Sequence, residues 1–247
     1  MKFRVQISMA ILLLAPAIAA AGDKEKQKPA GNMIDSGTLG VFMNGRRVAT
    51  ETFSIQQNND GSTVSSQFKS DGETQRAEQT SELQLTPGIE IRKYEWKEVS
   101  PGKAQATVSP NNEFLMERSS SGPNEKPVEQ PFMLPSTTSI LDDYFFIHRE
   151  VLIWRYLATS CKQDKGSTMC PANQKTQFGT LNPHQRAPVP LTLEFSGRDK
   201  ISIRGTEREL NKFVLRGDAG DWLIWVDDRF MLQRIVVASD NTEVVRD

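Results

Sequence analysis

The sequence contains few residues that could bind a metal ion, with only two cysteines and two histidines among 247 residues. A four-ligand zinc site would have to bring both histidines, His148 and His184, to the cysteine pair, and these residues lack the compact spacing of such sites. We therefore expect neither a metal nor a cofactor.

The motifs of the common enzyme classes are also absent. The chain has no G-x-S-x-G elbow, no H-E-x-x-H pair and no phosphate-binding glycine loop. Asp142 and Asp143 precede His148 by six and five residues, whereas neighbours on a helix face are three or four apart. We therefore expect His148 and His184 to be structural residues with satisfied hydrogen bonds, and we do not expect an enzyme.

A long hydrophobic run occurs only at the N-terminus, from Ile7 to Ile18. It follows Lys2 and Arg4 and precedes three alanines at 19–21, which is the layout of a cleavable signal peptide. The run is shorter than the roughly 20 residues that cross a membrane as a helix, so an uncleaved anchor is the weaker alternative. The sequence predicts a signal peptide at 1–21 and a periplasmic or secreted protein without a transmembrane anchor.

The charge balance does not suggest a nucleic acid or an anionic membrane surface as a partner. The chain has 30 basic and 31 acidic residues, and loss of the signal peptide removes only Lys2 and Arg4. The mature chain then carries 28 basic against 31 acidic residues, a net charge of −3.

The two cysteines, Cys161 and Cys170, lie close together in the stretch CKQDKGSTMC. In an exported protein such a pair is typical of a disulfide, which would contribute about 2 to 3 kcal/mol to stability. A redox-active pair is a poorer interpretation, because eight intervening residues are far from the Cys-x-x-Cys arrangement.

The residues after the signal peptide predict strands. Residues 22–36 are polar and are expected to be a flexible leader. From residue 37 onward, short half-apolar runs alternate with turn-forming pairs, of which Asn44-Gly45 is typical of a two-residue hairpin. Residues 119–136 contain four prolines and are expected to be a loop.

One helix is predicted, over residues 139–157, with Ser139 as its cap and Asp142 in its first turn. Its apolar surface is broader than the stripe of an ordinary surface helix and must be covered on most sides. Residues 158–190 follow as an irregular disulfide loop, and strands resume up to residue 247.

These patterns predict a mainly β member of the α+β class. We expect residues 37–247 to form a single domain, in which a strongly curved antiparallel sheet, an incomplete barrel, packs on one main helix. Aromatic residues of the helix and the strands could line a cavity between them, although a filled core would use the same residues. The candidate ligand-binding residues are Phe145, Trp154, Trp96, Trp222, Trp225 and Phe213.

The early meander GTLGVFMNGRRVATETFSI, the break in the middle of the chain and the closing hairpin DWLIWVDDRFMLQRIVV resemble a known group. They are similar to uncharacterised periplasmic proteins related to the outer-membrane lipoprotein carrier and receptor (LolA/LolB-like) fold. The resemblance spans residues 37–247 and implies an incomplete antiparallel barrel that holds acyl chains. The chain departs from that fold in its single helix and its disulfide loop, and no functional residue carries over.

The expected function is therefore binding of a hydrophobic or lipidic ligand, or of a partner that presents one, between the sheet and the helix. Two alternatives stay open: an envelope interaction or assembly protein, and a hydrolase with an unrecognised site. Four glutamates could supply the carboxylate pair of a glycosidase, but nothing in the sequence brings any two of them together. These are Glu95, Glu98, Glu113 and Glu117.

Overall fold

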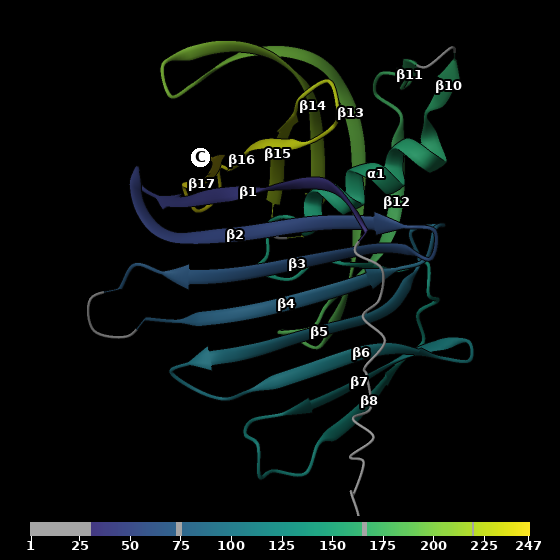
Figure 1. Ribbon diagram of the computed structural model, residues 1–247. Coiled ribbons are helices and arrows are strands. Elements are labelled where there is room, and N and C mark those ends of the chain that lie inside the picture. The colour runs from purple at the N-terminus through teal and green to yellow at the C-terminus, as the bar shows by residue number, and fades with distance from the viewer. Residues whose placement is uncertain (1–30, 73–75, 165–166, 219) are drawn as a thin grey trace, which may run out of the picture.

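The computed structural model describes residues 31–72, 76–164, 167–218 and 220–247 (Figure 1). The predicted signal peptide, residues 1–21, and the first part of the predicted leader, residues 22–30, lie outside this range. No helix in the described part of the chain is long and apolar enough to cross a membrane.

Most of the described chain belongs to one open sheet of 15 strands, which runs in the order β8-β7-β6-β5-β4-β3-β2-β1-β17-β16-β15-β14-β13-β12-β9. The strands of its first part are β1 (Asn32–Met43), β2 (Arg46–Asn58), β3 (Gly61–Ser70), β4 (Glu78–Leu85), β5 (Ile91–Ser100), β6 (Gln105–Asn111), β7 (Phe114–Ser120), β8 (Val128–Phe132) and β9 (Ser139–Ile140). Those of its second part are β12 (Lys175–Asn182), β13 (Ala187–Ile203), β14 (Thr206–Gly217), β15 (Gly220–Val226), β16 (Leu232–Val237) and β17 (Thr242–Arg246).

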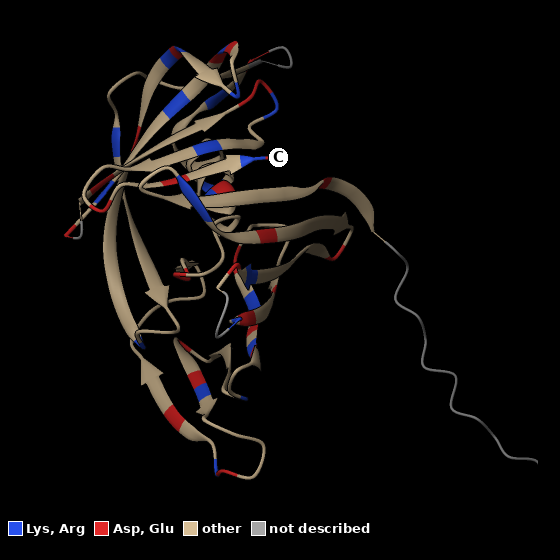
Figure 2. Cartoon of the chain, turned by 90° about the vertical axis from the view of Figure 1, so that its left-hand side faces the viewer, with Lys and Arg blue, Asp and Glu red and all other residues tan. Residues whose placement is uncertain are grey.

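The sheet has two halves that meet where β1 pairs with β17. Figure 1 shows β1 to β8 as one ladder in chain order, which confirms the predicted meander, with the strands of the second half beyond β1. All neighbours are antiparallel except β9 and β12. The mainly antiparallel β class with one helix is thus confirmed. Figure 2 shows positive and negative residues interspersed along the strands.

The predicted hairpin at Asn44-Gly45 is confirmed. Both residues have positive φ angles, 50° and 75°, as a two-residue turn between twisted strands requires. They join β1 to β2, which pair along nearly their whole length.

The prediction of a flexible leader over residues 22–36 is wrong from Asn32 onward, because strand β1 begins there and pairs with β2. One polar residue of this segment, Asp35, has a specific partner in β17. The Asp35 carboxylate accepts two hydrogen bonds from the Arg246 guanidinium, at 2.9 and 2.5 Å, and is only 9% exposed. The ion pair satisfies a buried charge that would otherwise oppose strand formation.

The predicted loop at 119–136 also contains structure, because β8 pairs with β7 through residues 128–132. Pro131 is tolerated because β8 is an edge strand, where one side of the backbone needs no partner.

The helix is shorter at its start than predicted. Helix α1 spans His148–Ser160, whereas residues 139 and 140 form β9 and residues 141–147 are irregular. Ser139 is therefore not its cap and Asp142 is not in its first turn. The residue at the cap position, Ile147, has no side-chain oxygen to offer.

A carboxylate from the sheet takes the place of that cap. Glu51 of β2 is fully buried and accepts hydrogen bonds from the backbone N–H groups of Phe146 (2.7 Å) and Ile147 (3.4 Å). The Ser66 hydroxyl donates a third bond to it, at 2.7 Å. The carboxylate satisfies the N–H groups of the cap residue and of the residue before it, which would otherwise lie unbonded in the core where α1 begins.

The helix is covered on nearly all sides of its first two turns, as its broad apolar surface predicts. Its buried residues are His148, Arg149, Glu150, Val151, Leu152, Ile153 and Tyr156. Glu150 returns a bond to the sheet, since its Oε2 accepts the N–H of Leu232 in β16 at 2.6 Å. The helix is thus anchored to both halves of the sheet.

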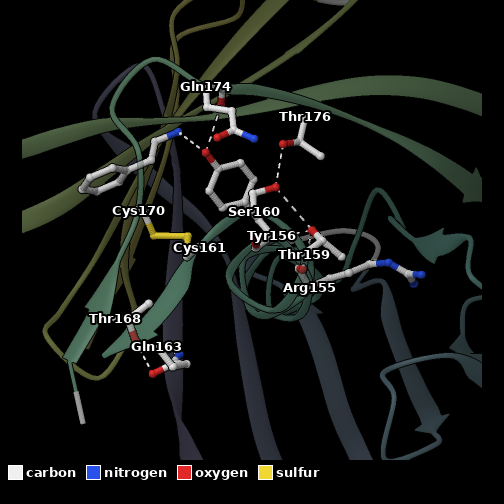
Figure 3. Close-up of a disulfide and its surroundings, with 11 residues drawn as sticks. Arg155, Tyr156, Thr159, Ser160, Cys161, Gln163, Thr168, Cys170, Gln174 and Thr176 are labelled. Atoms are coloured by element: carbon white, nitrogen blue, oxygen red, sulfur yellow. Dashed lines mark hydrogen bonds between the residues drawn. A yellow bond between two sulfur atoms is a disulfide. The ribbon is translucent and has the colours of Figure 1, made fainter. Parts of the chain in front are cut away.

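The disulfide between Cys161 and Cys170 is confirmed, and it lies directly after α1 (Figure 3). It encloses a small hairpin, β10 (Lys162–Asp164) and β11 (Ser167–Met169). The Tyr156 hydroxyl donates to the Gln174 carbonyl at 2.9 Å, and Ser160 bonds Thr176 at 2.7 Å. The end of the helix is therefore fixed to the segment that leads into β12.

The prediction that residues 158–190 are irregular is wrong for the part after the disulfide, because it contains β12 and the start of β13. Pro188 and Pro190 suggested a loop, but they lie where β13 pairs only with β12. Pairing of β13 with β14 begins at Thr192, so a missing N–H on that side breaks no ladder.

Replacing both cysteines by serine (Cys161→Ser with Cys170→Ser) should lower the free energy of unfolding by about 2 to 3 kcal/mol, because the unfolded chain gains loop entropy. Urea denaturation followed by circular dichroism measures the change. The reduced wild type should match the double variant, and equal stability of the oxidised and reduced proteins would contradict the expectation.

Glu51 should give the fold a pH dependence of defined sign. Burial raises its pKa from 4.5 to about 7, although its hydrogen bonds from Ser66, Phe146 and Ile147 act in the opposite direction. Between these two values the folded chain holds a proton that the unfolded chain has released, so this group's contribution to stability falls as the pH rises from 4.5 to 7. Relative to Glu51→Gln, the wild type should lose roughly 1.4 kcal/mol per pH unit there, or about 3 kcal/mol in total.

Chemical denaturation of both proteins at pH 4.5 to 8 tests this expectation. If the free energies of unfolding of wild type and Glu51→Gln changed with pH in parallel, Glu51 would be ionised in the folded protein throughout that range.

Candidate functional site

A pocket of about 300 Å³ lies between the chain around the start of α1 and strands β12 to β15. The apolar part of its wall consists of Leu141, Pro188, Val189, Pro190, Leu191, Leu215 and Trp222. Its polar lining includes Asp143, Arg149, Thr180, Asn182 and Gln185. An apolar wall with a few polar groups is typical of a small-molecule site.

A second hollow, of about 460 Å³, lies over β2 to β5. Its lining consists mainly of serine and threonine with Glu82, Glu95 and Lys97. Most of these side chains alternate along the strands with the buried ones, so they belong to the polar outer face of the sheet. Ser66 and Ser81 of this lining are buried, and the Ser66 hydroxyl is already bonded to Glu51.

Arg149 is the least exposed charged residue of the pocket lining, with 4% of its surface accessible to solvent. Its Nη1 donates to the carbonyls of Asp142 (2.5 Å) and Phe145 (3.0 Å). The guanidinium lies 4.6 Å from the ring centroid of Trp222. Burial lowers the pKa of Arg149, while Asp143, Asp142 and Glu51 partly offset this effect through space.

Beside the pocket, His184 and Asp142 form a hydrogen-bonded pair. The Nδ1 atom of His184 lies 2.7 Å from Asp142 Oδ2, and its Nε2 lies 2.8 Å from Gln79 Oε1. The imidazole stacks on Trp96 with ring centroids 4.0 Å apart. Asp142 also accepts the Tyr94 hydroxyl at 2.6 Å. The pair therefore joins the loop between β12 and β13 to the inner face of β4 and β5.

Asp142 is fully buried yet suited to carry a negative charge. Burial would raise its pKa, but the hydrogen bond and the charge of His184 together with the Tyr94 bond bring the pKa below its usual value. With the Gln79 amide in this orientation, both ring nitrogens of His184 face oxygen atoms.

The geometry of this pair does not form a catalytic triad. A triad needs a nucleophile within hydrogen-bond reach of the free imidazole nitrogen. At His184 the amide oxygen of Gln79 holds that position. In this arrangement the pair holds a loop and a buried charge in place.

Glu117 adds a second buried carboxylate to this region. Its side chain is inaccessible to solvent, and its Oε1 lies 3.3 Å from the Nε of Arg186. Burial raises the pKa of Glu117 to about 7, although the charges of Arg186 and His184 act to lower it. No group of three or more histidines, cysteines, aspartates or glutamates in the described part of the chain could hold a metal ion.

His148, the other histidine, is fully buried but has no hydrogen-bond partner at either ring nitrogen among the described residues. The expectation of a satisfied hydrogen bond is therefore wrong for His148. Its ring packs against Tyr94 and Phe145 instead, with centroids 5.5 and 5.8 Å apart. Burial lowers the pKa of His148 to about 3, so the ring is neutral at pH 7.

The six predicted ligand-binding residues do not converge on one cavity. Of these, Trp222 lines the pocket, and Trp96 stacks on His184. Phe145 and Phe213 are fully buried in the core, and Trp154 donates its indole N–H to the Phe230 carbonyl at 3.3 Å.

Trp225 lies on the opposite face of the sheet from Trp222. The two residues are three apart in β15, and side chains alternate between faces along a strand. Trp225 packs in a small separate cluster with Ile203, Leu210 and Val245. It therefore cannot line a cavity between sheet and helix.

Sequence reasoning missed Arg149 and the partnership of Asp142 with His184. A charged residue at 149, in a predicted helix whose broad apolar surface must be covered on most sides, was an available signal, because buried arginine is rare. Nothing in the sequence indicated that His184, 42 residues away, would bond Asp142.

Comparisons with known proteins do not identify a family. No family model matches the chain, and no curated protein matches it. Among solved structures, the chain is similar to a DUF1089 family protein from Pseudomonas aeruginosa at 9% identity and a TM-score of 0.44, covering 74% of this chain and 86% of that one. A likeness of this size carries no argument about function.

Substitution of the two histidines by phenylalanine should lower the stability at pH 7 by different amounts. His148→Phe keeps the ring contacts and removes two unbonded nitrogens, so it should cost less than about 1 kcal/mol at pH 7. Below pH 6.5 the unfolded chain protonates His148 and the folded chain does not, which destabilises the wild type. The variant should therefore gain about 2 kcal/mol relative to wild type between pH 7 and pH 5.

His184→Phe is the matched control. It leaves the buried Asp142 carboxylate without its partner and should cost about 3 kcal/mol at pH 7. Guanidinium denaturation of the three proteins at both pH values measures these differences. A large loss of stability in His148→Phe at pH 7 would show that its ring nitrogens are bonded.

Proposed function

We propose that this chain is an exported binding protein for a small apolar, acyl-type ligand, which it holds between the start of α1 and strands β12 to β15. The observation that carries this proposal is the pocket of about 300 Å³ whose apolar lining includes Leu191, Leu215 and Trp222. Burial of apolar ligand surface against this wall, at about 25 cal/mol per Å², would drive binding without a covalent step.

The pocket volume limits the size of the ligand. At roughly 30 Å³ per small group, about that of a water molecule in the liquid, the pocket has space for about ten heavy atoms. An eight-carbon chain with a small polar end has this size, whereas a whole phospholipid does not. A larger lipid would place only the end of one acyl chain in the pocket.

Export is part of the proposal. The N-terminal 21 residues have the layout of a signal peptide, and the Cys161–Cys170 disulfide suits an oxidising compartment, such as the periplasm or the extracellular space. The sequence resemblance to periplasmic proteins with the lipoprotein carrier and receptor fold supports the same location and the same kind of cargo. The strongly curved, incomplete barrel of that fold remains a prediction for this chain.

Fluorescence titration with octanamide, a neutral ligand of about ten heavy atoms, tests the proposal. Binding should change the tryptophan emission of the wild type. The change should be lost in Trp222→Phe and kept in Trp225→Phe, because these residues lie on opposite faces of the same strand.

Native mass spectrometry of the purified protein, before and after solvent extraction, gives an independent measurement and identifies any natural cargo. An apo mass together with no response to octanamide would refute the binding proposal and favour an envelope interaction protein. An identical response in both tryptophan variants would place the ligand outside this pocket.

A further inference from the structure

We infer that the ligand of this pocket is a monoanion, a medium-chain carboxylate, whose charged end binds Arg149. This inference rests on the proposed function and adds the chemical class of the ligand. Its basis is Arg149, a residue of the pocket lining that is 4% exposed and whose guanidinium makes no ion pair with any described residue.

The hydrogen bonds of Arg149 do not use all of its N–H groups. Nη1 uses both of its N–H groups, on the carbonyls of Asp142 and Phe145. Nε has no partner, and no bond from Nη2 lies within the described residues. Because Nε is inaccessible to solvent, Nη2 is the nitrogen through which Arg149 can donate a charge-assisted hydrogen bond to a ligand.

A buried cation without an opposite charge is costly, and the neighbouring carboxylates do not remove that cost by direct contact. Asp142 bonds Tyr94 and His184. Asp143 Oδ1 and Oδ2 accept the side-chain amides of Asn182 and Gln185, at 2.7 and 3.0 Å. These carboxylates and Glu51 act on Arg149 only through space.

The same carboxylates select the charge of the ligand. A group with two negative charges, such as a phosphate monoester, would be repelled by Asp143 and Asp218, which line the pocket, and by Asp142 and Glu51, which act on Arg149 through space. A single negative charge meets less repulsion and needs only a hydrogen bond from Nη2 of Arg149. The apolar wall at Leu191, Leu215 and Trp222 then takes the alkyl chain.

The purely structural alternative is that Arg149 only holds the turn at 142–145 and stacks on Trp222. Its two carbonyl bonds and its ring contact fit that role. They do not use the remaining N–H groups, and a structural role predicts no preference for an anionic ligand.

The experiment compares octanoate with octanamide, which has the same number of heavy atoms but no charge, by isothermal titration calorimetry at pH 7.5. Wild type should bind octanoate about 10- to 100-fold more tightly, as expected for a hydrogen bond to a charged group. Arg149→Met should bind the two ligands equally. Arg155→Met removes another cation of α1, one that bonds the Ile89 carbonyl and does not line the pocket, and it should keep the preference.

The outcomes separate the inference from the proposed function. Equal affinities in wild type, or a preference that persists in Arg149→Met, would overturn the carboxylate inference and leave apolar binding intact. Tighter binding of octyl phosphate than of octanoate would overturn the choice of a monoanion. Absence of binding by either eight-carbon ligand would refute the proposed function together with the inference. If Arg149→Met fails to fold, the wild-type comparison alone decides.

Discussion

The carboxylate of Glu51, buried beneath the start of α1, is the interaction on which the relation between helix and sheet depends. It accepts the N–H groups of Phe146 and Ile147, which a helix without a cap of its own would leave unsatisfied in the core. Glu150 makes the reciprocal contact, from the helix to Leu232 of the other half of the sheet. Because Glu51 and Glu150 are both buried, the helix cannot slide or rotate without breaking their hydrogen bonds to backbone N–H groups in the core. Arg149 lies between these two anchors, so its position beside Trp222 is a consequence of them.

Sequence reasoning succeeded where structure is local. Asn44-Gly45 defines its turn by backbone preference, and Cys161 and Cys170 are close enough in the chain to pair without other information. It failed where a residue far away in the sequence determines the local structure. Residues 139–147 fit a helix equally well, and the carboxylate of Glu51, 95 residues from Phe146, bonds the backbone just before the true start at His148.

The candidate site was predictable to a similar extent. Strand alternation, applied to β15, separates Trp222 from Trp225 without a structure, so one of the two could have been excluded from a shared cavity. The partners of Asp142, Tyr94 and His184, lie on a different strand and in a different loop, 48 and 42 residues away. Buried polar clusters of this kind depend on tertiary packing, and composition does not reveal them.

The pairing of β1 with β17 has a consequence for how the molecule assembles. Each half of the sheet consists largely of hairpins between neighbours in sequence, which can form early and independently. The seam between the halves joins residues such as Asp35 and Arg246, which are 211 positions apart. Closing so long a loop costs more entropy than closing a hairpin, so the seam is expected to form late. Interactions across it then govern how fast the native sheet opens more than how fast it forms.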